Sequence, residues 1–85
     1  MNYKLSLHAK KQLQTRNIPE EIVFSVLSNP DKYFQQDDCL KVFQKIVEHD
    51  KKRYLYRVFV NICKKPSLVV TAYRTSKIKK YENKI

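Results

Sequence analysis

Glycine and tryptophan are absent from this chain of 85 residues, which has one methionine and two cysteines. Without glycine the chain cannot form the glycine-rich loops that cradle phosphates, and it lacks the Asn-Gly turns that close many β-hairpins. Each tight turn must therefore use asparagine, aspartate, lysine or proline. The sequence has no run of about 18 apolar residues and no segment typical of a signal peptide, so we expect a cytoplasmic protein.

Cysteine and histidine are scarce as well. Cys39 and Cys63 are far apart in the sequence and do not form a CxxC motif. In a reducing cytosol their simplest interpretation is as two packing thiols. A zinc site would need more ligands at suitable spacing than His8 and His49 supply, so we expect neither a metal nor a small-molecule cofactor.

Acidic residues are outnumbered, with 8 Asp and Glu against 18 Lys and Arg, giving a net charge of +10. Such an excess predicts a polyanionic partner, nucleic acid first and an acidic protein second. A membrane surface fits less well, because no segment combines a dense lysine face with a strongly apolar one. The hydrophobic content of 42% is sufficient for one folded domain over residues 1–85.

The apolar pattern predicts an α+β domain. A short alternating segment and two helical segments come first, and three longer strands joined by polar turns follow. The strands are expected over residues 3–7, 40–48, 53–63 and 68–74, and the helices over 9–15 and 19–27. Residues 31–38 are ambiguous, because Tyr33 and Phe34 could begin a strand. We therefore expect two N-terminal helices packed on a three- to four-stranded antiparallel sheet, with a short C-terminal basic tail.

The segment 68–81 combines an apolar strand with a basic, aromatic tail. Its candidate nucleic-acid contacts are Tyr73, Arg74, Lys77, Lys79, Lys80 and Tyr81. Lysine and arginine would contact phosphates and the tyrosines would stack on bases, although a solvated basic terminus is the alternative. Strand alternation places Arg74 on the face opposite Tyr73, so both can line one site only if the strand ends or twists there.

Arg57 is a charge in the middle of an apolar strand, and Arg53 lies on the same face nearer the turn. The planar guanidinium of Arg57 could clamp a phosphate, because its fork binds two oxygens at once. The alternatives are an exposed strand face or a salt bridge to Glu48 across the hairpin. Arg53 near the turn is more simply a solvated residue.

Metal-free RNA cleavage would also need groups that accept and donate protons. The candidates are His8, His49, Glu48 and Tyr73. His8 is the stronger histidine because it stands where the first strand meets the first helix, although it could equally cap the helix or pack against it. His49 lies in a polar turn, where a solvated loop residue is the alternative.

The order of elements and of several short motifs resembles the RelE/ParE-like toxin superfamily, and more closely an uncharacterised bacterial family near the BrnT-type toxins. The motifs are His8-Ala9, Arg16 with Ile18, Val26-Leu27-Ser28-Asn29-Pro30, Tyr56-Arg57-Val58 and residues 70–77. The resemblance covers nearly the whole chain. It departs from the family at Gln12, where members often have arginine, and at Asn17, where they often have glycine.

This resemblance implies a toxin-like protein encoded beside an antitoxin. Related toxins cleave mRNA, so we expect a metal-independent endoribonuclease with His8, Arg57 and Tyr73 as catalytic residues. The expected nucleic-acid contacts are Arg53, Arg74, Lys77, Lys79, Lys80 and Tyr81. The expected partners are RNA and an acidic antitoxin that covers the basic face. Two alternatives stay open: a non-catalytic RNA- or DNA-binding module of the same fold, and a toxin that inhibits a protein such as gyrase.

Overall fold

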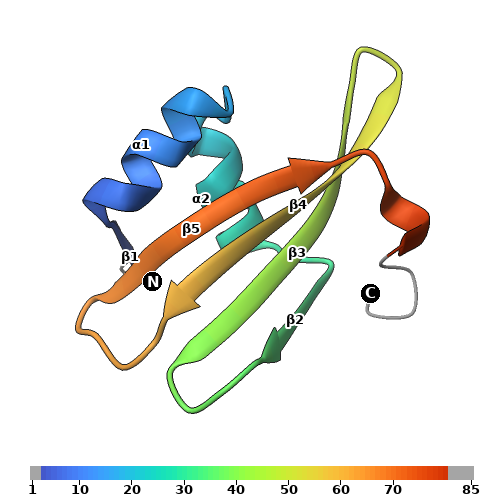
Figure 1. Ribbon diagram of the computed structural model, residues 1–85. Helices are drawn as coiled ribbons and strands as arrows, with labels where there is room; N and C mark the ends of the chain where they lie inside the picture. Colours follow the sequence, from blue (N-terminus) through green and yellow to red (C-terminus); the bar gives the residue numbers. More distant parts are fainter. Residues whose placement is uncertain (1–2, 81–85) are drawn as a thin grey trace.

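The computed structural model describes residues 3–80, which form two helices and one five-stranded sheet. The elements are β1 (Tyr3–Leu5), α1 (Leu7–Thr15), α2 (Glu20–Ser28), β2 (Lys32–Gln35), β3 (Leu40–His49), β4 (Lys52–Asn61) and β5 (Ser67–Thr75). The strands lie in the order β1-β5-β4-β3-β2, and both helices pack on the same face of the sheet (Figure 1). We call the other face the open face.

The prediction of a three- to four-stranded antiparallel sheet is wrong, because the sheet has five strands and is mixed. β1 pairs in parallel with β5, from Tyr3 opposite Ser67 to Leu5 opposite Val69. The ambiguous segment forms β2, which pairs antiparallel with β3. Local periodicity identifies a strand but not its partner. Both helices and three strands separate β1 from β5 in the sequence, so neighbouring residues do not reveal that the two strands pair.

α1 begins two residues earlier than predicted, because Ser6 caps it. The Ser6 hydroxyl oxygen accepts a hydrogen bond from the Ala9 amide at 3.0 Å, satisfying one of the free donors of the first turn. After α1, Asn17 takes a left-handed conformation with φ of 54°, the conformation that asparagine tolerates best in the absence of glycine. Pro19 then precedes α2 as its N-cap, with Glu20 and Glu21 in the first turn, where negative charge is favourable.

α1 also protects the outer edge of β5 where β1 has ended. Arg16 Nη1 donates to the carbonyl of Ala72 at 2.7 Å, and the Thr71 hydroxyl is hydrogen-bonded to the side-chain oxygen of Gln12. These side chains satisfy an edge that would otherwise be open to another strand. Neither helix among residues 3–80 is long and apolar enough to cross a membrane.

The core lies between the helices and the sheet. Its buried apolar side chains are Leu5, Ala9, Leu13, Ile18, Val23, Val26, Leu27, Phe43, Tyr56, Val58, Val60, Val69 and Ala72. The helical members recur at the spacing of one helix face, and the strand members alternate, as expected for elements that bury one side. The two-residue turn between β3 and β4 consists of Asp50 and Lys51, both with positive φ, and so forms without glycine.

Cys39 and Cys63 form a disulfide with a Cα–Cα distance of 5.1 Å, so the prediction of two packing thiols is wrong. The antiparallel register places Leu40 opposite Asn61, which brings the positions just before β3 and just after β4 together. The sequence alone does not reveal this proximity, because the whole β3–β4 hairpin separates the two cysteines. The disulfide closes the end of that hairpin opposite the Asp50-Lys51 turn.

Candidate nucleic-acid interface

The register of the sheet brings Arg57 to the open face with two polar partners. Gln44 of β3 lies directly opposite Arg57, and Tyr73 of β5 lies opposite Arg57 on its other side. Residues paired across antiparallel strands share a face. The neighbouring residues Tyr56 and Val58 pack against the helices, so alternation directs Arg57 to the open face.

The guanidinium of Arg57 is held from two sides. Its Nε donates to Gln44 Oε1 at 2.7 Å, and its Nη1 donates to the Tyr73 hydroxyl at 2.6 Å. It also lies over the rings of Phe59 and Tyr73, at 5.4 and 5.7 Å from their centroids. A guanidinium fixed in this way loses little further freedom when it binds an anion. Glu48, the salt-bridge alternative, lies opposite Arg53 instead.

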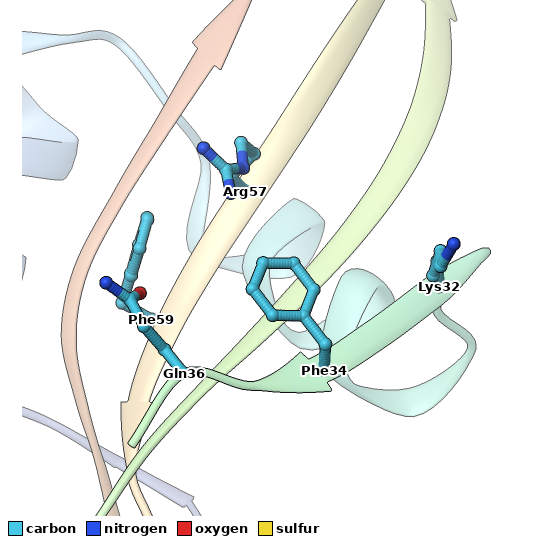
Figure 2. A pocket seen from close by; sticks show the side chains of 5 residues that line it. All are labelled: Lys32, Phe34, Gln36, Arg57 and Phe59. Atoms are coloured by element: carbon cyan, nitrogen blue, oxygen red, sulfur yellow. The ribbon is translucent and has the colours of Figure 1, made fainter. Parts of the chain in front are cut away.

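A hollow of about 680 Å³ opens beside Arg57, within the size range of ligand sites. Its lining residues are Lys32, Phe34, Gln36, Arg57 and Phe59 (Figure 2). Phe34 of β2 and Phe59 of β4 both lie opposite Val42 of β3, which is fully buried between them. The backbones of β2 and β4 are therefore about 10 Å apart across β3. The hollow thus has an aromatic ring on each side and cations from β2 and β4.

Gln44 is fully buried beside this hollow and was missed by sequence reasoning. Its side-chain oxygen faces Arg57, and its Nε2 has no hydrogen-bond partner among the described residues. An unsatisfied buried donor costs about 1–3 kcal/mol. An apolar side chain would pack at this position without that cost, whereas Gln44 orients Arg57. The available signal was a Gln44-Lys45 pair between the apolar pairs Val42-Phe43 and Ile46-Val47.

A second hollow, of about 490 Å³, lies near the start of β4. Its lining residues are Arg53, Ser76, Lys77, Ile78, Lys79 and Lys80. Arg53 and Arg57 share a face of β4 and are four residues apart, or about 13 Å, with the fully buried Leu55 between them. The two hollows therefore lie one after the other along β4.

The structure brings together some of the predicted site residues and separates others. Arg57 and Tyr73 are in contact, and Arg53 lines the second hollow with Lys77, Lys79 and Lys80. Tyr81 lies outside the described residues. Sequence reasoning also missed Phe34 and Phe59, since aromatic residues in strands are more often core than binding surface.

Two of the predicted residues lie away from Arg57. Arg74 pairs with Tyr56 on the helix-covered face and donates a hydrogen bond to the Tyr56 hydroxyl at 3.3 Å. This hydrogen bond raises the pKa of the Arg74 guanidinium. Arg74 and Tyr73 therefore lie on opposite faces of the sheet, as the alternation of β5 predicts. His8 is exposed in the first turn of α1, the helix that packs on the other face of the sheet. The catalytic roles of His8, Arg57 and Tyr73 stay predictions.

The family described as Domain of unknown function (DUF4258) matches residues 5–74 of the chain. The match spans well over half of the 85 residues, so the chain belongs to this family. It includes β3, β4 and nearly all of β5, and thus Gln44, Arg57 and Tyr73, whereas Lys77 and Lys79 lie beyond it. No curated protein and no solved structure matches the chain.

Proposed function

We propose that this member of the DUF4258 family binds single-stranded RNA along β4 on the open face of its sheet. The observation that carries the proposal is the Arg57 guanidinium, fixed by Gln44 and Tyr73 at a hollow with aromatic sides. An oriented guanidinium binds phosphate or a base edge, and aromatic rings stack on unpaired bases. The resemblance to mRNA-cleaving toxins favours RNA over DNA.

The second hollow supports the same proposal by extending the cationic surface. Arg53 lies on the face of Arg57, and the lysines after β5 gather around it. An RNA strand that places one phosphate at Arg57 would have further phosphates within reach of Arg53 and these lysines. In a toxin–antitoxin system, an acidic antitoxin segment would bind this surface and exclude the RNA.

A metal-independent endoribonuclease is the second candidate. The observation in its favour is the 2.6 Å hydrogen bond between Arg57 and the Tyr73 hydroxyl. The Tyr73 phenol could donate a proton to the leaving 5′ oxygen while solvent water accepts the proton of the attacking 2′ hydroxyl, and the adjacent guanidinium would stabilise the charged phosphorane. His8 belongs to a helix on the other face, so in this candidate Tyr73 carries the proton transfer without it.

Fluorescence anisotropy of labelled RNA tests the proposal. We expect a single strand to bind at least about tenfold more tightly than its duplex, because only unpaired bases can stack on Phe34 and Phe59. We also expect log K to fall with log salt by about 0.7 for each phosphate contact. Lack of binding at low salt, or equal binding of strand and duplex, would contradict the proposal.

The integrity of the bound RNA separates the two candidates. RNA recovered intact on a denaturing gel selects the binding module. Cleavage that persists in chelator and is lost in Tyr73→Phe selects the endoribonuclease. Tyr33→Phe is a matched control, because Tyr33 is an exposed tyrosine on the edge strand β2 and pairs with Phe43 on the helix-covered face.

A further inference from the structure

The helix-covered face of the sheet extends past the helices toward the β3–β4 turn (Figure 1). The register places His49 opposite Lys52 on this extension, and Tyr56 opposite Arg74 at its inner end, where the Tyr56 ring packs in the core. Tyr54 lies between Lys52 and Tyr56 on the same face of β4. This group is separate from Arg57, which alternation places on the open face.

Two cations gather around one aromatic ring in this group. The Arg74 guanidinium lies 4.8 Å from the centroid of Tyr54, and Lys52 Nζ lies 5.6 Å from the same centroid. Arg74 is exposed and also donates to the Tyr56 hydroxyl. Two like charges at one ring repel each other, and an anion in contact with both would reduce that repulsion.

His49 adds a third polar group with an unsatisfied atom. Its ring centroid lies 6.4 Å from that of Tyr54 and 6.2 Å from that of Tyr56. Its Nε2 is buried and has no hydrogen-bond partner within residues 3–80. As an N–H donor, Nε2 would hydrogen-bond to an anion, so the free energy lost by leaving it unsatisfied would be recovered on binding.

The surrounding charges favour an anion as well. Lys45 of β3 lies opposite Tyr56, although its Nζ already donates to the carbonyl of Asn29 at 2.8 Å. Of the nearby carboxylates, Glu48 alternates to the open face and Asp50 is exposed in the turn. The charge on this part of the surface is therefore positive.

We infer that His49, Lys52, Arg74 and the Tyr56 hydroxyl form a second anion site, which binds a phosphate monoester. A phosphate monoester carries about −1.5 to −2 charges at neutral pH and three strong acceptor oxygens. This charge matches two permanent cations and an imidazole N–H donor. The phosphate can come from free phosphate or from the 5′ end of an RNA strand.

Nuclear magnetic resonance in a phosphate-free buffer tests the site, with inorganic phosphate as the probe. We expect the imidazole signals of His49 to shift and saturate, while those of His8, exposed on α1, stay in place. Arg74→Gln should weaken this binding at least about tenfold, since it removes a charged hydrogen-bond donor. Lys10→Gln, which removes one charge from the exposed side of α1, should leave it unchanged. Equal shifts of both histidines, or no shift of His49, would overturn the inference.

Lys52→Gln is the second variant, because Lys52 is exposed and its replacement leaves the Tyr56 hydrogen bond intact. It should also weaken phosphate binding, and unchanged affinity in both folded variants would overturn the site. Two RNA strands, one with a 5′-phosphate and one with a 5′-hydroxyl, distinguish free phosphate from the end of an RNA strand as the source of the bound phosphate. Tighter binding of the phosphorylated strand, lost in Arg74→Gln, assigns the strand end. Equal binding together with a saturating His49 shift assigns free phosphate.

Discussion

Replacement of Arg57 by alanine is expected to weaken binding of single-stranded RNA by about 10- to 100-fold. The change removes a guanidinium that Gln44 and Tyr73 hold in place, and hydrogen bonds to charged groups contribute about 1.5–3 kcal/mol each. Anisotropy titrations with a 5′-hydroxyl strand measure the effect. That strand avoids any contribution from a terminal phosphate at Arg74.

Two variants separate the position of the charge from its amount. Arg74→Ala removes the same charge from the opposite face and should weaken binding less than about threefold, the size expected for a distant charge. Arg57→Lys keeps the charge but loses the planar fork, so it should resemble Arg57→Ala more than the wild type. Similar losses for Arg57→Ala and Arg74→Ala would show that only net charge matters.

Arg57→Ala also removes the Nε–H that donates to the Gln44 oxygen, so a loss of folding must be distinguished from a loss of binding. We expect the unfolding free energy to fall by about 1–3 kcal/mol, because a buried amide is left without its hydrogen bond. The double variant Gln44→Leu/Arg57→Ala should recover part of this stability without recovering RNA affinity. Recovery of affinity in the double variant would argue against the role of Arg57.

Removal of the Cys39–Cys63 disulfide is expected to lower the free energy of unfolding by about 3 kcal/mol. The bond closes a long loop and so restricts the unfolded chain, and a domain of this size has little other stability in reserve. The corresponding fall in melting temperature is roughly 10–20 °C. Thermal unfolding of Cys39→Ser/Cys63→Ser, followed by circular dichroism, measures it.

Reductant provides the matched control for this prediction. Dithiothreitol should lower the melting temperature of the wild type to that of the double variant and leave the double variant unchanged. A wild-type melting temperature that does not respond to reductant would contradict a stabilising disulfide. RNA binding should survive in both proteins below their melting temperatures, because neither cysteine lines the hollow beside Arg57.

Local patterns in the sequence located most of the elements. The helices and the three long strands lie within a few residues of their predicted positions, since apolar spacing reflects which side of an element is buried. The expectation that asparagine, aspartate or lysine replaces glycine in turns also holds at Asn17, which takes the left-handed conformation after the first helix. Alternation along β5 also separated Tyr73 from Arg74 correctly. These features depend on a few neighbouring residues.

Features that depend on distant pairing could not be predicted in this way. The parallel pairing of β1 with β5, the formation of β2 and the disulfide all require the register between separate strands. The same holds for Gln44, whose importance comes from Arg57, the residue directly opposite it on β4. Arg57 was recognised as a charge in an apolar strand, but the residues that fix its guanidinium come from β3 and β5.

The most direct test of the open face as an RNA-binding surface is backbone and side-chain NMR of the protein titrated with a 5′-hydroxyl single strand. The largest shifts should occur at Phe34, Arg57 and Phe59, with further shifts near Lys77. The exposed outer positions of α2, such as Phe24, should not move. Shifts concentrated on the two helices, with Arg57 unaffected, would contradict RNA binding along β4.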